Sequence, residues 1–437
     1  MPFINYGKGR DRLWFVENLH GNAEYAVEVN GILADEKSSF QHLQILDTAR
    51  LGTILVLDGI VQTSSVLEFS APYGEMLAHL PLITHPYPQK GLIIGGGDYE
   101  IAREVFKHPL IEHLALVDID RRVGELTLKF MPDFTGGAEK DPRLHVHSED
   151  GAEFVKRAAD GSYDFVLIDS TDPGGPSTPL FNARFIRNVY RILKPGGIVA
   201  RQVGSLQFQP DEAPSNFRCI QSIFGEASLY LSSVPIYWGG LFGFVIASKS
   251  GPLPRKISHS DIDSRYAASG IETIYYNPEI HRSAFQLPNY IKKRLETVYG
   301  CELIMEIEGC DLDITDAEKK CEEFVTRLCE KIAMKRFGDF QYYDFGHAKS
   351  KTSGPSFVQL IETSSIVGHV SNYWDGTLYL DLFTCKDFDP QVAIDFAREF
   401  FGARVAFGVF LERGSVRNSR NKRMHVLDEF CSERKNG

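Results

Sequence analysis

The sequence contains no run of about 18 or more apolar residues, so we expect no helix that crosses a membrane. The segment Met1 to Asn5 lacks a basic stretch followed by an apolar one, so we do not expect a signal peptide. Only seven cysteines occur, without the spacing of a disulfide framework, and this favours a reducing cytoplasm. Positive charge is also scarce, because 47 Lys and Arg face 58 Asp and Glu, for a net charge of -11. This balance disfavours nucleic-acid binding and is compatible with a cationic small substrate.

What the chain does contain is typical of a folded protein of two or three domains, with 437 residues, 43% hydrophobic and 24% charged. We expect domain boundaries that give residues 1–85, 86–295 and 296–437. The first segment alternates apolar and polar residues between turn signals. Its Asp58-Gly59 pair, between two runs rich in β-branched residues, predicts a hairpin, and the segment as a whole predicts a small antiparallel β domain.

The second segment alternates short apolar runs with helical patterns such as Phe185 to Leu193. This alternation predicts a doubly wound, parallel sheet of Rossmann type, which binds ligands at the carboxyl ends of its strands. The strands that we expect are Gly91–Ile94, His113–Asp118 and Phe165–Asp169.

The third segment has an α+β pattern and is separate from the first two. We expect the basic tail after Arg413 to be frayed. The elements predicted in this segment are strands at Leu303–Glu308, Ser356–Glu362 and Leu378–Phe383, and helices at Asp316–Lys331 and Pro390–Phe401.

Acidic turns follow the predicted strands of the central segment. Gly95-Gly96-Gly97-Asp98 is a glycine-rich turn, which either lets a ligand approach the backbone or simply joins a strand tightly to a helix. Asp118, about 20 residues further on, is placed to accept hydrogen bonds from ribose hydroxyls. Asp150-Gly151 adds a third acidic turn, suited to an adenine amine. Three such turns in succession favour an adenosine-type ligand.

These turns belong to a series of motifs in the order found in spermidine and spermine synthases, which the chain resembles over about residues 10 to 292. The resemblance implies a methyltransferase-like sheet preceded by a small β domain, in a homodimer. It also implies transfer of an aminopropyl group from decarboxylated S-adenosylmethionine to an amine such as putrescine or spermidine, with release of methylthioadenosine. The motifs are Ser38–Gln41, Leu55–Gly59, Gly95–Asp98, Asp169–Pro176, Val234–Gly240 and Tyr275–Pro278.

The resemblance also implies roles for single residues. Asp98 would meet the amino end of the transferred group, and Asp169, with Asp172 beside it, would accept the proton. The amine substrate would contact Glu68, Tyr73 and Tyr237. The residues that would hold the nucleoside are Gln41, Gly95, Gly97, Asp118, Asp150, Gly151 and Pro176.

The chemistry of such a transfer explains the paired aspartates. An alkylamine near pH 7 is protonated and has no lone pair with which to attack the carbon next to a sulfonium. A carboxylate both binds the ammonium and accepts its proton, and Asp169 and Asp172 lie three positions apart on one loop. The alternative for Asp172-Pro173 is a cap or turn without catalytic role. Residues 170–180 are further candidates for a loop that closes over the substrates.

Two departures from the family pattern keep other functions open. In the first, Leu67 replaces an acidic residue before Glu68-Phe69, and Tyr73-Gly74-Glu75 follows two residues later than in the family pattern. In the second, Tyr99-Glu100 replace a glycine pair after Asp98. A second enzymatic hypothesis is therefore an N-methyl or aminocarboxypropyl transferase that uses intact S-adenosylmethionine. A third is a regulatory ligand-binding scaffold without activity. No spacing of histidines or cysteines predicts a metal site.

The third segment resembles the bacterial-type S-adenosylmethionine decarboxylase at Cys301–Asp311 and Asp381–Cys385. In that family an internal serine cleaves the chain and becomes a pyruvoyl group, which serves as an electron sink. Alignment on His369 makes Ser364 the source of the pyruvoyl group and Cys385 the proton donor, whereas alignment on Glu362 places Thr363 there instead. We favour a non-catalytic, dimerising domain, with a working decarboxylase that makes the donor for its neighbour as the alternative.

Overall fold

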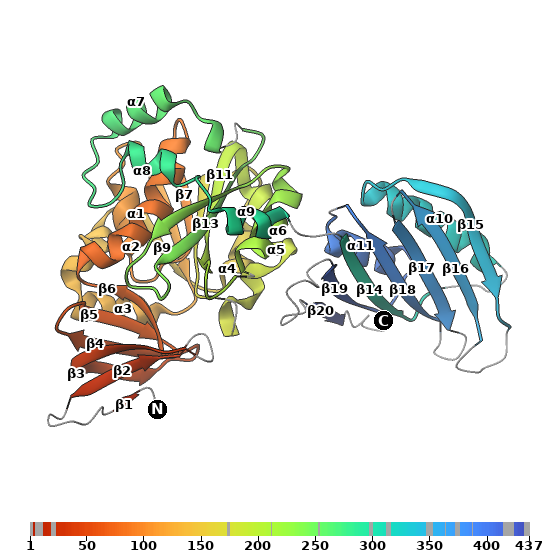
Figure 1. Cartoon of the computed structure of the whole chain (residues 1–437), viewed down its shortest axis with the longest axis horizontal. Helices are drawn as coiled ribbons and strands as arrows, with labels where there is room; N and C mark the ends of the chain where they lie inside the picture. Colours follow the sequence, from red (N-terminus) through yellow and green to blue (C-terminus); the bar gives the residue numbers. More distant parts are fainter. Residues whose placement is uncertain are drawn as a thin grey trace. The chain divides into compact units, whose positions relative to one another are not determined.

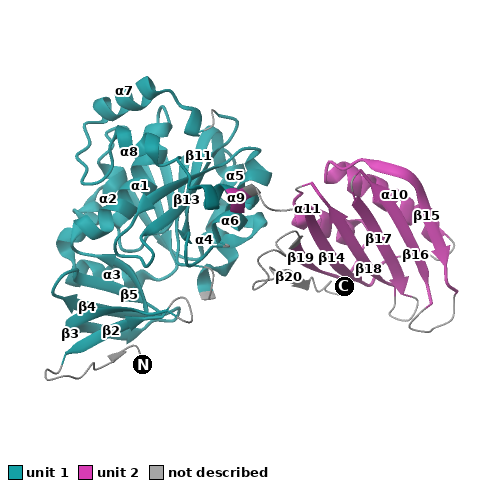
Figure 2. Ribbon diagram, viewed as in Figure 1, with its two compact units in different colours: residues 1–292 teal, residues 293–437 magenta. Residues whose placement is uncertain are grey.

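In the computed structural model the chain forms two compact units, residues 1–292 and 293–437 (Figure 2). Their described residues form three β-sheets, one N-terminal, one central and one C-terminal (Figure 1). The structure describes residues 3–4, 12–18, 23–172, 175–210, 212–251, 254–296, 300–311, 316–346, 353–362, 364–371, 376–386, 388–413 and 424–431.

The N-terminal sheet is antiparallel, and its six strands lie side by side in chain order. The predicted hairpin is confirmed, because Leu57 pairs with Ile60 across Asp58 and Gly59. Both turn residues have positive φ angles of 48° and 81°, as the tight hairpin turn requires. The strands are β1 (Phe3–Ile4), β2 (Leu13–Glu17), β3 (Tyr25–Lys37), β4 (His42–Thr48), β5 (Gly52–Leu57) and β6 (Ile60–Ser64).

The central sheet has the order β12-β13-β11-β10-β7-β8-β9. Its five strands from β11 to β9 are parallel, as expected, but β13 pairs antiparallel with both β11 and β12. The predicted doubly wound parallel sheet is therefore confirmed in these five strands, and an antiparallel hairpin extends it at one edge. The strands are β7 (Lys90–Gly95), β8 (His113–Asp118), β9 (Leu144–Ser148), β10 (Tyr163–Asp169), β11 (Leu193–Ser205), β12 (Ser228–Ser233) and β13 (Leu241–Ser248).

Helices cover the faces of the central sheet (Figure 1). The long helix α1 packs on β10, β11 and β12, and every side chain from Ser70 to Thr84 is buried, which explains why α1 is apolar around most of its circumference. No helix in the described part of the chain is long and apolar enough to cross a membrane. The helices are α1 (Leu67–Thr84), α2 (Glu100–Phe106), α3 (Arg121–Phe130), α4 (Gly151–Arg157), α5 (Ala183–Ile192), α6 (Glu212–Phe224), α7 (His259–Ser269), α8 (Pro278–Ser283) and α9 (Asn289–Glu296).

The C-terminal unit is an antiparallel sheet of order β15-β16-β17-β18-β14-β19-β20 with two helices, which confirms the α+β prediction. The expectation of a frayed tail is wrong for Met424–Cys431, which pairs with β19 as strand β20. Residues 414–423 and 432–437 lie outside the described residues. The elements are β14 (Gly300–Glu308), α10 (Ala317–Lys331), β15 (Arg336–Asp344), β16 (Pro355–Ile361), β17 (Ser364–Ser371), β18 (Thr377–Thr384), α11 (Pro390–Phe400), β19 (Val405–Arg413) and β20 (Met424–Cys431).

Candidate active site

A cavity of about 370 Å³ opens where the order of the parallel strands reverses, between β7 and β10. The turn after β7 approaches the end of β10 so closely that a Cβ atom on Gly95 would lie 1.8 Å from the carbonyl oxygen of Asp169. Gly95 also has a φ of +84°, which other residues rarely adopt. The glycine-rich turn is therefore needed to bring Asp98 and Asp169 to one cavity, whose lining includes both.

The cavity is strongly acidic. Eight carboxyl side chains line it, and its described lining contains no Lys, Arg or His. Such a site concentrates cations and disfavours anions. The eight residues are Glu17, Asp58, Asp98, Glu100, Asp118, Asp150, Asp169 and Asp172.

At one side of the cavity Asp118 is fixed by the backbone. Its Oδ2 accepts a hydrogen bond from the N–H of Gly97 (3.0 Å) and its Oδ1 one from the N–H of Asp120 (2.8 Å). Burial raises the pKa of Asp118 to about 6, against the lowering effect of these two bonds. Gln41 lines the same cavity, and its side chain donates to Asp120 (3.0 Å). Asp118 and Gln41 thus offer polar groups in fixed positions.

Asp150 caps helix α4, and its Oδ1 accepts hydrogen bonds from the N–H groups of Ala152 (2.7 Å) and Glu153 (3.3 Å). Since Oδ1 is the oxygen that makes the cap, Oδ2 stays available to a ligand. Gly151 and Pro176 line the cavity with it. The structure therefore brings together all the residues that the resemblance implied for nucleoside binding.

Asp169 ends strand β10, and its Oδ1 accepts a hydrogen bond from the hydroxyl of Tyr73. The pKa of Asp169 is raised to about 7, mainly by burial and also by the negative charge of Asp98, although the bond from Tyr73 lowers it. A carboxyl with this pKa changes protonation state close to neutral pH, as a general base must.

Asp172 lies further along the same loop and is held by two amides. Gln202 donates to its carboxylate at 3.4 Å, and Gln209 donates to the other oxygen. The backbone carbonyl of Asp172 accepts a bond from Ser177 (2.6 Å). Residues 173 and 174, within the loop that we expected to close over the substrates, lie outside the described residues. Asp172 is thus oriented by side chains of β11 and of the segment after it.

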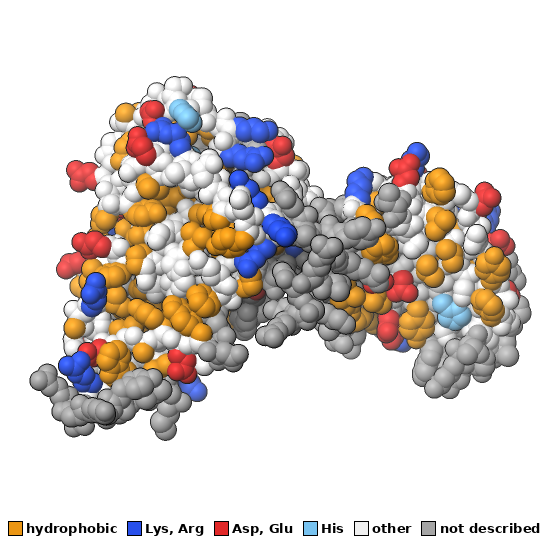
Figure 3. Space-filling model, viewed as in Figure 1, with side chains coloured by type: hydrophobic (Ala, Val, Ile, Leu, Met, Phe, Trp, Pro, Cys, Tyr) orange, Lys and Arg blue, Asp and Glu red, His pale blue; other side chains and the backbone are white. Residues whose placement is uncertain are grey.

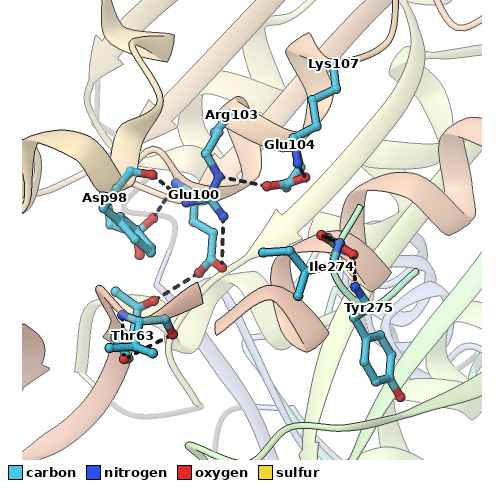
Figure 4. A network of polar contacts seen from close by, with 12 residues as sticks. Thr63, Asp98, Glu100, Arg103, Glu104, Lys107, Ile274 and Tyr275 are labelled. Atoms are coloured by element: carbon cyan, nitrogen blue, oxygen red, sulfur yellow. Dashed lines mark hydrogen bonds and ion pairs between the residues drawn. The ribbon is translucent and has the colours of Figure 1, made fainter. Parts of the chain in front are cut away.

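The turn after β7 also starts a polar network that runs along α2 (Figure 4). The backbone N–H of Glu100 donates to Asp98 Oδ1 (3.0 Å). The Glu100 carboxyl accepts a bond from Thr63 (3.1 Å) and lies 3.6 Å from Arg103, which also bonds Glu104 (2.7 Å). Burial raises the pKa of Asp98, against the lowering effects of the bond from the Glu100 N–H and of the charge of Arg103.

Of the residues implied for the amine, Tyr73 and Tyr237 line the cavity and Glu68 does not. The Tyr237 hydroxyl donates to the carbonyl of Gln62 (2.7 Å), and its ring packs edge-on against Tyr73. Glu68 is exposed on the first turn of α1. Tyr99 is also outside the lining, because its ring packs close to Gly124. The cavity is therefore not filled by Tyr99.

Sequence reasoning missed several polar residues of this cavity. Glu17 comes from β2, accepts a bond from the N–H of Val61 (2.8 Å), and has a pKa that burial raises to about 7. Nothing in its local pattern distinguishes it from any other glutamate in a strand. Three further residues were missed as well: Glu100, Gln202 and Gln209. For Glu100 a signal was available, because it replaces a glycine of the family pattern.

A second buried cluster lies between α1 and α2. The ligand atoms of Glu75, His79 and Glu104 lie within 4.8 Å of one another, a spacing compatible with a metal ion. Each is already engaged, since His79 bonds both His108 (2.9 Å) and Glu104 (3.0 Å). Glu75 accepts three backbone N–H bonds from residues 274–276 (2.7–2.8 Å; Figure 4). These bonds explain the cluster as a structural one.

In the C-terminal unit, Ser364 and Cys385, two of the three residues implied for decarboxylation, lie in contact with each other. The backbone N–H of Cys385 donates to Ser364 Oγ (3.0 Å). His369 lies five residues further along β17, where its ring bonds Ser356 (2.7 Å). Thr363, the residue favoured by the other alignment, lies outside the described residues.

A Rossmann-like sheet, with a glycine-rich turn and carboxylates at its strand ends, places this unit in the class of enzyme folds of the methyltransferase type. Comparison with known proteins narrows this class. Residues 70–256 match the spermine/spermidine synthase domain, residues 13–65 the spermidine synthase tetramerisation domain, and residues 301–414 the S-adenosylmethionine decarboxylase family.

Whole relatives agree with these domain matches. The polyamine aminopropyltransferase of Moorella thermoacetica is 41% identical over 284 residues, which is 65% of this chain and 96% of the relative. That of Ruegeria sp. is 37% identical over 281 residues, 64% of this chain and 98% of the relative. The chain therefore belongs to the polyamine aminopropyltransferase family and carries an additional S-adenosylmethionine decarboxylase-like domain.

Solved structures show the same relationship. A spermidine synthase in complex with the transition-state analogue AdoDATO superimposes with a TM-score of 0.62 at 32% identity, covering 66% of this chain and 96% of that one. The spermidine synthase from Thermotoga maritima gives a TM-score of 0.61 at the same identity and coverage.

Proposed function

We propose that the chain transfers an aminopropyl group from decarboxylated S-adenosylmethionine to an amine such as putrescine or spermidine. The observation that carries this proposal is the position of Asp169, which has a pKa near 7 and lies in a cavity lined by carboxyl groups. Both substrates are cations, and this cavity attracts cations.

The nucleoside is held by the side of the cavity that contains Asp118 and Asp150. Asp118 accepts hydrogen bonds from the ribose hydroxyls, and the free oxygen of Asp150 accepts one from the adenine amine. Gln41, Gly151 and Pro176 complete this side. The sulfonium then faces the gap between Asp98 and Asp169, where negative charge stabilises it.

The transfer itself needs one proton acceptor. Asp169, ionised, binds the ammonium of the acceptor and takes one of its protons, which leaves a lone pair on nitrogen. The lone pair attacks the carbon next to the sulfonium, the C–S bond breaks, and its electron pair stays on sulfur as methylthioadenosine forms. Tyr73 holds the carboxylate in line, and Asp172 helps to orient the amine.

The acceptor amine occupies the side of the cavity opposite the nucleoside. Tyr237 and Glu17 line that part, and Glu17 lies near enough to Asp172 for the two charges to repel. We assign to Glu17 the role of binding the distal ammonium, for which Glu68 is too exposed.

The experiment that tests this function supplies the purified full chain with decarboxylated or intact S-adenosylmethionine and with several diamines and triamines. Mass analysis of the products should show methylthioadenosine and an amine heavier by one aminopropyl group, with the decarboxylated donor only. A methylated or aminocarboxypropylated amine formed from the intact donor would instead support the competing transferase hypothesis.

We also propose that the chain works in the cytoplasm as a homodimer built of three domains, with boundaries near residues 85 and 295. The match of residues 13–65 to a tetramerisation domain supports self-association. A further observation is the face of the C-terminal sheet that bears Ile304, Leu360, Val367 and Tyr379, each at least 36% exposed. Figure 3 shows apolar side chains spread over this unit.

For the C-terminal domain the contact between Ser364 and Cys385 favours Ser364 as the residue that a self-processing chain would convert. The separate position of His369 favours a domain that does not process itself. A pyruvoyl group derived from Ser364 would supply an electron sink for decarboxylation. Cys385, whose backbone N–H donates to Ser364 Oγ, would then be the proton donor.

A denaturing gel decides between the two versions. Processing at Ser364 gives two fragments, of about 363 and 74 residues by position in the sequence, and Ser364→Ala then gives one intact band. One intact band for the wild-type chain shows that the domain does not process itself and supports the non-catalytic, dimerising role.

A further inference from the structure

Glu100 is a carboxyl in the cavity at a position where the family pattern has glycine. Tyr99, with a φ of 66°, turns the chain at the start of α2. Its own ring packs near Gly124, whereas the next residue, Glu100, lines the cavity. The pair of replacements therefore adds one acidic group to the site without blocking it.

The surroundings of Glu100 hold its carboxyl in place and leave one of its two oxygens without a hydrogen bond. Oε2 accepts the bond from Thr63 (3.1 Å), and Arg103 lies 3.6 Å from Oε1 (Figure 4). Oε1 has no hydrogen-bond partner among the described residues, although the residue is only 3% exposed. Gly74 makes room for this oxygen, since a Cβ atom there would lie 2.7 Å from it.

The charges that face Glu100 are mostly negative. Asp98 and Asp169 face it from the cavity, Glu104 from its own helix, and Arg103 is the cation that opposes them. Tyr73 and Tyr237 are the neutral titratable groups nearby. An ammonium at this point favours the ionised forms of Asp98 and Glu100, and the two carboxylates then repel a third one.

We propose that Glu100 selects the donor, because with Asp98 it binds the primary ammonium of the aminopropyl chain and rejects a chain that carries an α-carboxylate. This inference rests on the proposed function and adds a specificity-determining residue to it. Intact and decarboxylated S-adenosylmethionine differ by that one carboxylate, so the residue distinguishes the substrate of the reaction from its more common precursor.

Burial supports the assignment, because it raises the pKa of Glu100 well above the usual range. An ammonium beside the carboxyl favours its ionised form. Binding of the decarboxylated donor is therefore expected to release a proton, which a purely structural side chain would not do.

The test is isothermal titration of the full chain with decarboxylated and with intact S-adenosylmethionine, in two buffers of different ionisation enthalpy. Glu100→Gln should weaken binding of the decarboxylated donor about tenfold or more, because a charge-assisted hydrogen bond is lost. It should also lower the ratio of the dissociation constant of the intact donor to that of the decarboxylated donor. The buffer-dependent heat should decrease, with the remainder coming from Asp98 and Asp169, whose pKa values are also raised. Glu104→Gln is the matched control. It removes a buried carboxylate of the same helix, but this carboxylate does not line the cavity. The ratio of the two dissociation constants in this variant should equal that of the wild type.

An unchanged ratio in Glu100→Gln would overturn the inference. Should that variant fail to fold, Glu100→Gly restores the residue of the family pattern, with the same expected result. Failure of the proposed function is seen separately, because a wild-type chain that converts neither donor fails before any variant is compared.

Discussion

The hydroxyl of Tyr73 donates a hydrogen bond to Oδ1 of Asp169, and this bond links helix α1 to the end of strand β10. The Tyr73 ring is held edge-on between Tyr237 and Phe242, at centroid distances of 5.5 and 5.7 Å. The carboxyl that we assign as the base is thus oriented by a side chain that has little freedom of its own.

This bond leads to a prediction for pH dependence. It lowers the pKa of Asp169, so Tyr73→Phe should raise that pKa above its value of about 7. The base must be ionised to act, and activity is therefore lost as the pH falls through its pKa. We expect the acidic limb of the kcat/KM profile to move to higher pH in Tyr73→Phe. A profile that falls everywhere by the same factor would show that Tyr73 does not act through Asp169.

Asp169→Asn should reduce turnover by about 10²-fold or more, because general-base catalysis contributes that much. The same change should raise stability at pH 8. The folded-state pKa of Asp169 is about 7, raised from 3.8, so the folded chain binds the proton more tightly than the unfolded chain. Stability therefore falls as the pH rises from about 4 to 7, and the uncharged asparagine escapes this loss.

The measurement is the melting temperature of wild type and Asp169→Asn at pH 5 and at pH 8. The advantage of the variant should be larger at pH 8. A variant that is less stable than the wild type at pH 8 would mean that the ionised carboxylate stabilises the fold, against our account.

Glu75 anchors the segment of residues 274–276 through three backbone N–H bonds, and it is fully buried. Glu75→Ala leaves these donors without partners and should cost about 3 kcal/mol or more in the free energy of unfolding. Glu279→Ala is the control, since this residue is 77% exposed and pairs with Arg282 at the surface, and its effect should stay within about 1 kcal/mol. Chemical denaturation measures both. Equal effects would contradict the role of Glu75.

Gln209 orients Asp172, and Gln209→Leu should free this carboxylate. We expect the KM for the amine to rise about tenfold while the dissociation constant of the nucleoside donor stays unchanged, because Asp172 is assigned to the amine. Gln207→Leu removes an exposed amide two residues earlier and serves as control. Weaker donor binding in Gln209→Leu would place Asp172 on the nucleoside side instead.

The site was largely predictable where its residues follow strands in the sequence. Asp118 and Asp169 end β8 and β10, and the glycine-rich turn follows β7, so parallel pairing alone brings them to one edge. The hairpin at Asp58-Gly59 was predictable for a similar reason, since its turn chemistry is local.

Residues that reach the cavity from other elements were not predictable in this way. Glu17 enters from β2 of the N-terminal sheet, and Gln209 follows β11, so only the packing of distant segments places them there. The antiparallel edge formed by β12 and β13 was missed because an apolar run does not reveal the direction of a strand. The strand β20 was missed because it forms by pairing with β19, and local composition does not reveal which strands pair.

The central claim is that Asp169 lies within reach of the carbon bound to the sulfonium of a nucleoside. A crystal structure of the full chain soaked with methylthioadenosine tests it most directly. We predict the ribose hydroxyls on Asp118, the adenine near Asp150, and the sulfur facing the gap between Asp98 and Asp169. Methylthioadenosine bound elsewhere, or in this cavity with its sulfur turned away from Asp169, would contradict the account.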